Sequence, residues 1–449
     1  MIIHQKKRSL GGRGTEAPSR GREVHRTQAA HLFQTHPDKP TPSKAWSNFR
    51  AKPQAGIRPA MMNPPPAMLN AIFGFEMPTR LLLGAGAVGN LSFECSLHGW
   101  RSALIVTDRG VHGVGLTTPV ESQLQEANVR YEIYDSVLPN PTIECIETAV
   151  PLARDKEVVI GVGGGSVMDS AKLINVLRTH GGRVMDYEGT DTVPGTCRPL
   201  IAVPTTAGTG SEVTFIAMFT HPERRQKMPV LSRHLAPYLA IVDPEMSRYL
   251  PPAPTAQTGM DALTHAIEAV VDLQANPLSD VLAFEAIWLI LRYLPRAVSN
   301  GANDMEARGA MAFAATIAGA AFNNSMVGLA HALAHAIGGL YDLPHGLCCA
   351  LALPHAMEFN LESRRDRFEQ IAQAMEVETP EDAILRVRQL MSDIGIPAHL
   401  FDLDIRVSEE ELEQLVDLTF ADGSLLFNPV QPTREQVRTL LQRIATYAP

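Results

Sequence analysis

The chain has 449 residues, 45% of them apolar and 19% charged, with a formal net charge of −9 at pH 7. This composition is typical of a globular, water-soluble protein, and the length predicts more than one domain. The negative charge argues against nucleic acid as a partner. No apolar run approaches the roughly 18 residues of a membrane span, since the nearest, 281–294, contains Glu285 and Arg292.

The cysteines are odd in number and scattered, without a CxxC spacing: Cys95, Cys145, Cys197, Cys348 and Cys349. This pattern predicts neither a disulfide framework nor a zinc ribbon. A reducing compartment fits it, and we expect the cytoplasm.

Residues 1–65 differ in kind from the rest. The first 60 hold 12 Lys or Arg against three acids, which leaves 27 basic and 45 acidic residues in the remainder. We expect a disordered basic extension. Three interpretations stay open: an Arg-rich presequence, a basic arm for an anionic partner, or a translation start set too early. We favour the last, since Met61, Met62 and Met68 offer later starts.

Residues 66–250 alternate short apolar runs with helical patterns, which predicts an α/β domain with a mainly parallel sheet. We expect helices at 117–129 and 167–177, and strands at 102–107, 131–134, 158–162, 200–203 and 239–242. Ligands of such sheets bind at the carboxyl ends of the strands.

A glycine cluster, Gly163, Gly164 and Gly165, followed by Ser166, lies between the strand at 158–162 and the next helix. Glycines permit close backbone approach, and the amides at a helix N-terminus attract anions, so this junction predicts a phosphate site of a dinucleotide. Ser166 and Asp169 are also spaced like a capping box, which is the structural alternative for both.

Asp108 closes the strand at 102–107, where an acidic residue could bind the ribose hydroxyls and favour NAD over NADP. A plain turn aspartate is the alternative, and the adjacent Arg109 argues for caution. Two more loops follow strands and are candidates for cofactor contacts: 139–142 with Asn140, and 204–212 with Thr205, Thr206 and Thr209. Ordinary turns are the alternative for both loops.

Residues 251–449 have helical apolar spacing throughout, so we predict a second, all-α domain after the break at Pro251 and Pro252. Expected N-terminal caps are Thr379, Ser408 and Thr433. The helices are expected at 258–271, 278–295, 304–322, 326–339, 363–375, 381–393, 409–420 and 433–446.

Two pairs of residues four apart carry the chemistry of this domain. Asp261 and His265 form one pair, and His331 and His335 form the other. That spacing places both members on one face of a helix. His345 follows after a Gly-Gly break and a Pro, so two helices and a loop can supply four ligands to one cation.

Four motifs in order resemble the iron-containing (group III) alcohol dehydrogenase family, and the similarity covers about residue 70 to the C-terminus. They are GGGSVMDSAK (163–172), PTTAGTGSEVT (204–214), GMDALTHAIEA (259–269) and GLAHALAHAIGGLYDLPHG (328–346). The resemblance implies an N-terminal dinucleotide-binding domain, a C-terminal helical domain, and NAD(P) and a divalent metal in the cleft between them. It also implies a homodimer or higher homo-oligomer.

The family's metal ligands map onto Asp261, His265, His331 and His345, and its additional active-site histidine maps onto His335. One carboxylate and three imidazoles suit ferrous iron or zinc, and spacing does not choose between them. We expect hydride transfer between NAD(H) and a small primary alcohol or aldehyde, with His335 as a proton relay or as the group that orients the nicotinamide ribose.

The resemblance further places Phe322 and Ile216 in the substrate pocket, Thr209 near the substrate or nicotinamide, and Lys227 at the cofactor. Simple core packing is the alternative for Phe322, and an exposed lysine is the more common explanation for Lys227. Val430 stands where many relatives have Arg, which weakens inferences about the substrate-side loop. Two alternatives stay open: a glycerol-dehydrogenase-like or dehydroquinate-synthase-like enzyme, and a non-catalytic protein that binds the cofactor.

Overall fold

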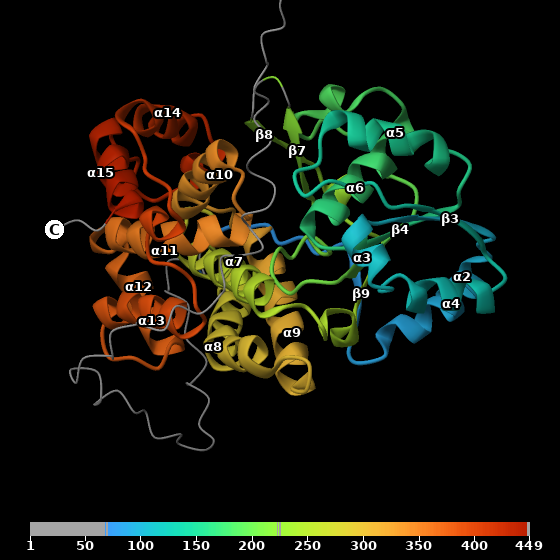
Figure 1. Ribbon diagram of the computed structural model, residues 1–449, viewed down its shortest axis with the longest axis horizontal. Coiled ribbons are helices and arrows are strands. Elements are labelled where there is room, and N and C mark those ends of the chain that lie inside the picture. The colour runs from blue at the N-terminus through green and yellow to red at the C-terminus, as the bar shows by residue number, and fades with distance from the viewer. Residues whose placement is uncertain (1–67, 69–70, 222, 224–225, 447–449) are drawn as a thin grey trace, which may run out of the picture. The chain divides into compact units, whose positions relative to one another are not determined.

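The computed structural model describes residues 68, 71–221, 223 and 226–446 (Figure 1). The basic extension predicted at 1–65, with the possible starts at Met61 and Met62, lies outside these residues. None of the helices that the structure describes is long and apolar enough to cross a membrane.

A six-stranded sheet, parallel throughout, organises the N-terminal half, so the predicted fold class is confirmed. Its spatial order is β1-β9-β6-β4-β2-β3. The strands are β1 Arg80–Leu83, β2 Ser102–Val106, β3 Arg130–Tyr134, β4 Val158–Gly163, β6 Leu200–Pro204 and β9 Leu239–Val242. The chain reverses its winding between β2 and β4, and ligands of open α/β sheets bind outside the carboxyl ends at such a point.

Helices cover both faces of this sheet. Leu104 and Val106 of β2 belong to the core beneath α5 and α6, whereas Ala103 and Ile105 belong to the core beneath α2 and α4. Burial on both sides explains why the inner strands β2, β4, β6 and β9 are continuous apolar runs in the sequence. The helices are α2 Leu91–His98, α4 Thr118–Glu126, α5 Ile143–Ala153 and α6 Gly165–His180.

A second sheet of three strands was missed by the sequence analysis. Strands β7 Ile216–His221 and β8 Gln226–Leu231 pair antiparallel, and β5 Gly189–Thr190 pairs with β8. Pro229 interrupts the apolar pattern of β8, and a proline argues against a central strand in a sequence. Here Pro229 stands opposite Met218 of β7.

The second half is helical, as predicted, and α7 begins at the expected proline break. The predicted caps at Thr379, Ser408 and Thr433 each form a capping box. The helices are α7 Pro252–Val271, α8 Pro277–Asn300, α9 Met305–Phe322, α10 Leu329–Tyr341, α11 His345–Asn360, α12 Arg365–Ala374, α13 Pro380–Asp393, α14 Glu409–Phe420 and α15 Arg434–Ala445. Helix α11 was not predicted from the sequence.

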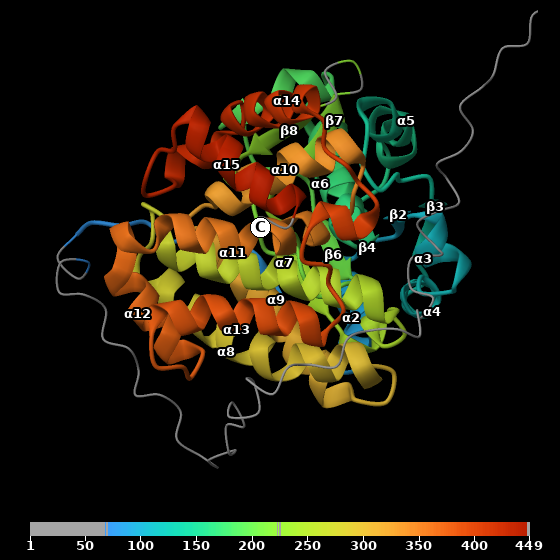
Figure 2. The same ribbon diagram turned by 60° about the vertical axis from the view of Figure 1, so that its left-hand side comes forward.

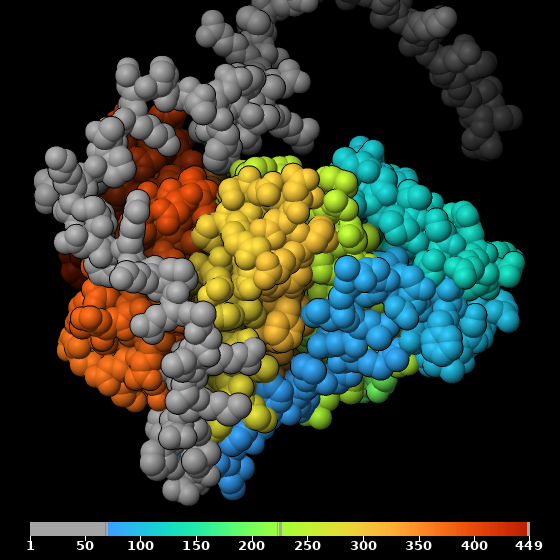
Figure 3. All heavy atoms as spheres, turned by 90° about the horizontal axis from the view of Figure 1, so that it is seen from below, coloured from blue at the N-terminus to red at the C-terminus, as the bar shows by residue number. Residues whose placement is uncertain are grey.

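Helices α7 and α11 pack against each other in the interior of the helical half (Figure 2), and one continuous apolar core surrounds them. Figure 3 shows the surface of α8 and α9 next to the first residues of the α/β half. A reciprocal pair of hydrogen bonds joins them, since the Glu76 amide donates to Asn324 at 2.6 Å and the Asn324 side chain donates to the Glu76 carbonyl at 3.0 Å.

Candidate metal centre and nucleotide loop

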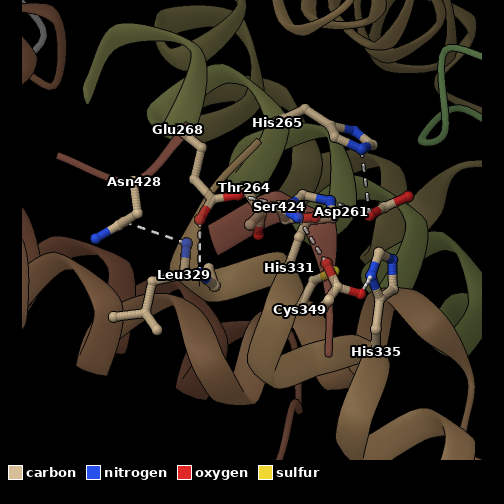
Figure 4. A network of polar contacts seen from close by, with 12 residues as sticks. Asp261, Thr264, His265, Glu268, Leu329, His331, His335, Cys349, Ser424 and Asn428 are labelled. Atoms are coloured by element: carbon tan, nitrogen blue, oxygen red, sulfur yellow. Dashed lines mark hydrogen bonds and ion pairs between the residues drawn. The ribbon is translucent and has the colours of Figure 1, made fainter. Parts of the chain in front are cut away.

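Helix α7 presents Asp261 and His265 one turn apart on its buried face (Figure 4). The Asp261 side chain is 2% exposed, and its Oδ1 has no hydrogen-bond partner among the described residues. His265 Nε2 lies 3.9 Å from this oxygen, and the His265 ring stacks on Phe322 at the end of α9 with the centroids 4.1 Å apart. Phe322 therefore fixes the plane of the His265 ring.

Helix α10 contributes His331, whose two ring nitrogens have different surroundings. Nδ1 lies 2.5 Å from Oε2 of Glu268, while Oε1 of Glu268 accepts the Ala330 amide at 2.6 Å. Nε2 has no partner among the described residues and lies 4.0 Å from Asp261 Oδ1. A carboxylate that holds one nitrogen of a histidine and leaves the other free is the usual support of a metal-bound imidazole.

His345 is the first residue of α11, not part of a loop as the sequence analysis assumed. Its Nε2 lies 3.4 Å from Asp261 Oδ1. The approach depends on Gly346, because a Cβ on this residue would come within 2.2 Å of the Gln257 carbonyl oxygen on α7. The structure thus brings all four predicted ligands around one carboxylate oxygen.

Cys349, one turn further along α11, also reaches this cluster, and the sequence analysis did not single it out. Its Sγ lies 3.6 Å from His345 Nε2. One ligand atom from each of Asp261, His331, His345 and Cys349 lies within 4.8 Å of all the others, whereas His265 is outside this group. Cys349 follows His345 by four residues, and this helical spacing is the signal by which the sequence could have placed Cys349 beside His345.

The protonation of the cluster suits a cation. Burial lowers the pKa of His265 to about 4 and lowers the pKa of His345 well below its usual value, where the charge of Lys227 adds to the effect. Both rings are then neutral near pH 7, the form that binds metals. Burial also lowers the pKa of His331, but the Glu268 carboxylate outweighs it, so the net shift is upward. The unpaired buried atoms Asp261 Oδ1 and His331 Nε2, together with the neutral imidazoles of His265 and His345, fit a divalent metal.

His335 has a different environment. Its Nδ1 lies 2.7 Å from Oδ2 of Asp422, which precedes the short 3-10 helix η8 Gly423–Phe427. Burial raises the pKa of Asp422, but His335 and Ser424 outweigh it and bring the value down to about 2. The carboxylate can then only accept, so Nδ1 carries the proton and Nε2 is the nitrogen left to accept one. The ring stacks on His345 at 5.2 Å.

The glycine-rich junction opens on a cavity of about 740 Å³. Its lining includes six of the predicted cofactor residues: Asp108, Gly164, Gly165, Ser166, Thr205 and Thr206. Asp108 also caps the short helix α3 Arg109–Gly113, because its Oδ1 accepts the Val111 amide at 2.9 Å. Asp108 therefore both caps α3 and lines the cavity.

The capping box considered for Ser166 and Asp169 does not form. Gly164 is the N-cap of α6, and no side chain caps it. Ser166 Oγ donates to the Pro139 carbonyl, and Asp169 accepts from Ser211 Oγ at 2.7 Å and from the Met218 amide at 3.1 Å. Asp169 is thus part of a buried hydrogen-bond network beneath the loop 204–214.

The other residues that were predicted to bind the cofactor or the substrate lie near the glycine-rich junction or near the loop 204–214. Gly163 packs on Val167, where a Cβ would come within 2.5 Å of the valine side chain, and Gly165 packs on Thr209 in the same way at 2.7 Å. Asn140 donates to Asp342 Oδ1 at 2.7 Å. The Ile216 carbonyl accepts from Lys172 at 2.7 Å, and its side chain packs against the helical core.

The loop 204–214 contacts both halves of the protein. A Cβ on Gly208 would come within 2.6 Å of Thr258 on α7, and one on Gly210, which has φ +62, would come within 2.4 Å of Gly319 on α9. Glu212 accepts from Thr316 Oγ1 at 2.8 Å. The loop is therefore fixed between the sheet and the helices that carry the metal-ligand cluster.

A parallel sheet with a glycine-rich junction, joined to helices that carry a carboxylate and several imidazoles, is typical of a metal- and nucleotide-dependent oxidoreductase. Residues 78–244 match the family described as iron-containing alcohol dehydrogenase, and residues 255–445 match the C-terminal part of the Fe-containing alcohol dehydrogenase family.

Known proteins agree with this match. Alcohol dehydrogenase 4 of Schizosaccharomyces pombe is 40% identical over 377 residues, which are 83% of this chain and 89% of that protein. NAD-dependent methanol dehydrogenase of Bacillus methanolicus is 37% identical over 378 residues, 82% of this chain and 98% of that protein. A solved 1,3-propanediol oxidoreductase has a TM-score of 0.80 at 36% identity and covers 83% of this chain and 100% of that chain.

The chain therefore belongs to the iron-containing alcohol dehydrogenase family, as its motifs predicted, and it is an alcohol oxidoreductase.

Proposed function

We propose that this protein transfers a hydride between NAD(H) and a small primary alcohol or aldehyde, with a divalent metal held by Asp261, His265, His331 and His345. The observation that carries the proposal is the convergence of three histidine nitrogens on Asp261 Oδ1, at 3.4, 3.9 and 4.0 Å. Two of the converging atoms, Asp261 Oδ1 and His331 Nε2, have no hydrogen-bond partner among the described residues. Ferrous iron is the favoured metal from the family, and zinc suits the same donors.

When bound, the metal supplies Lewis-acid polarisation of an alcohol or carbonyl oxygen, and the nicotinamide accepts or donates the hydride. The chain's own residues hold and orient these groups. His345 keeps 28% of its side chain exposed while Asp261 keeps 2%, so a substrate would approach from the His345 side.

His335 is the residue that we propose as the proton relay. Asp422 fixes its tautomer, so Nε2 is available to take the hydroxyl proton of an alcohol or to return it to an aldehyde. The His335 side chain is 16% exposed, which gives the proton a route to solvent. Phe322 and Ile216 would form apolar walls, and these favour a simple alcohol over a sugar.

The cofactor is proposed to bind in the cavity lined by Asp108 and the glycine junction. NAD is favoured, since the methanol dehydrogenase relative is NAD-dependent by name and an acidic residue at this position repels a 2′-phosphate. Thr209, Asn140, Asp169 and Lys227 remain predicted cofactor residues. We also propose domains at 66–250 and 251–449, a homodimer or higher homo-oligomer, and a cytoplasmic location.

The test is NADH absorbance with the purified protein, reconstituted anaerobically with ferrous iron or with zinc, against short primary alcohols and their aldehydes. We expect metal-dependent turnover that is lost in Asp261→Asn, since this nearly isosteric change weakens the central ligand. Asp417→Asn, a change of the same kind on the surface of α14, should keep activity. Tight NAD binding without turnover under either metal would contradict the proposal and favour the non-catalytic alternative.

A further inference from the structure

Helix α10, which carries His331 and His335, begins without a capping side chain of its own. Gly328 is its N-cap, and no side chain at this position accepts an amide of the first turn. A Cβ on Gly328 would come within 2.6 Å of Asp272 Oδ1 and within 3.0 Å of Asn428 Oδ1, so a serine, asparagine or aspartate has no room there. The amides of the first turn must therefore find acceptors elsewhere in the chain.

Two side chains from distant segments supply these acceptors (Figure 4). The Leu329 amide donates to Asn428 Oδ1 at 3.2 Å, and the Ala330 amide donates to Glu268 Oε1 at 2.6 Å. The other oxygen of Glu268 lies 2.5 Å from Nδ1 of His331, which is the third residue of the helix. The start of α10 and the ring of His331 therefore share one set of supports, so a shift of the first turn would move the imidazole.

The Asn428 side chain, which is 1% exposed, uses its full hydrogen-bonding capacity. Besides the Leu329 amide, its Oδ1 accepts from Asn360 Nδ2 at 2.8 Å. Its Nδ2 donates to Asn360 Oδ1 at 3.0 Å and to the Val430 carbonyl at 2.7 Å. A carboxamide has two acceptor positions and two hydrogens, so all four are in use. These bonds fix the orientation that turns Oδ1 towards α10, since the opposite orientation would set Nδ2 against the Leu329 N–H.

We propose that Asn428 is a positioning residue of the metal centre, which caps α10 from the C-terminal segment and thereby fixes the position of His331. The inference rests on the proposed function, because it needs His331 as a metal ligand. Asn428 acts through the helix and leaves the four ligands as they are. Loss of an outer partner of a ligand weakens metal binding by 10–100-fold, and Asn428 acts one step further from the ring than Glu268, so we expect a loss of roughly tenfold.

Asn276 offers a matched control. It is also a buried asparagine, 3% exposed, and it is the N-cap of α8, where its Oδ1 accepts the Leu278 and Ser279 amides at 3.2 and 3.1 Å. Helix α8 carries none of the four predicted ligands. Asn276→Ala therefore removes a buried helix cap of the same chemistry from a helix that does not hold the metal.

The experiment loads the full-length protein, Asn428→Ala and Asn276→Ala with Co²⁺ under anaerobic conditions. Competition with a chelator of known affinity measures cobalt binding, and the visible d–d bands report the geometry of the bound ion. We expect roughly tenfold weaker binding and altered d–d bands in Asn428→Ala, and unchanged affinity and bands in Asn276→Ala. Both variants should unfold at lower denaturant concentration, because each loses a helix cap.

The outcomes separate this inference from the proposed function. Unchanged cobalt affinity and bands in Asn428→Ala, or an equal loss in both variants, would overturn the positioning role and leave the metal centre standing. A failure of the unchanged protein to bind cobalt would overturn the metal centre, and with it both the proposed function and this inference. Should Asn428→Ala fail to fold, Asn428→Ser serves as the second variant. Its hydroxyl is too short to reach the Leu329 amide, so the same loss of affinity is expected.

Discussion

Two buried polar clusters on either side of the loop 204–214 differ in how their hydrogen bonds are completed. Beneath the loop, Lys172 donates to Ser211, Thr214 and the Ile216 carbonyl at 2.7–3.0 Å, and Asp169 accepts from Ser211 and Met218. In the helical half, Asp261 Oδ1 and His331 Nε2 have no partner among the described residues.

The difference separates a structural network from a binding site. A buried polar atom without a partner costs about 1–3 kcal/mol, so the helical cluster needs a partner that the described residues do not supply. A cation bound between Asp261 Oδ1 and His331 Nε2 would supply the missing partner for both atoms. The hydrogen bonds of Lys172 are made to groups of the chain itself, so this network holds the loop without requiring a cation from outside.

The sharpest test of this comparison is His345→Ala. Loss of a direct ligand should weaken metal binding by more than about 100-fold, since loss of an outer partner alone costs 10–100-fold, and turnover should disappear. Metal content after dialysis and NADH absorbance measure the two effects. Full metal occupancy in this variant would remove His345 from the ligand set.

His335→Ala separates the relay from the ligands. Because His335 lies beside the cluster and is held by Asp422, the variant should keep its metal and lower kcat by about 10²–10⁴-fold, as expected for loss of a general acid or base. Metal analysis and single-turnover kinetics measure this. Metal loss equal to that of His345→Ala would contradict the division of roles.

Lys172→Met tests the completed network. The change leaves Ser211, Thr214 and Asp169 without their buried cation, so the free energy of unfolding should fall by about 3–5 kcal/mol. Metal content of the folded fraction should stay unchanged. Denaturant unfolding measures the free energy of unfolding, and metal analysis measures the metal content. An unchanged free energy of unfolding would show that the network contributes little to stability.

Glu268→Gln should weaken metal binding by roughly 10–100-fold, because the carboxylate that orients His331 is lost while its shape is kept. Competition with a chelator of known affinity measures the change. Glu358→Gln on α11 is a control of the same chemistry away from the centre, and an equal effect in both variants would contradict the positioning role.

The smallest effect is expected at Asp108→Gly, which removes the carboxylate from the nucleotide cavity. Loss of one charge-assisted hydrogen bond of about 1.5 kcal/mol corresponds to about a tenfold change in the ratio of NAD to NADP preference. The ratio of kcat/KM for the two nucleotides measures it. An unchanged ratio would leave Asp108 with its capping role alone.

Helical periodicity explains how much of the site could be predicted. The pairs Asp261 with His265 and His331 with His335 could be recognised because a spacing of four places two side chains on one helix face. His345 was misplaced in a loop because α11 is buried nearly all round and contains Pro354, so it lacks the amphipathic pattern by which helices are recognised.

Partners distant in sequence gave no signal. Asp422 lies 87 residues from His335, and only the packing of the C-terminal segment brings the two together. Glu268 belongs to the same motif as Asp261, but its role depends on how α10 crosses α7, which spacing does not specify. The strands β7 and β8 are neighbours in sequence, and they were missed for a local reason, because Pro229 interrupts the apolar pattern of β8.

The contact between Asn140 and Asp342 joins the nucleotide side to the turn that leads into His345. Asp342 has φ +53, and its Oδ1 accepts the Asn140 amide at 2.7 Å. If a bound nucleotide draws Asn140 towards itself, as the proposed cofactor site implies, this hydrogen bond breaks and the turn is released. Nucleotide binding and the position of His345 would then be thermodynamically coupled. Such coupling is reciprocal: whatever the nucleotide does to metal affinity, the metal does equally to nucleotide affinity.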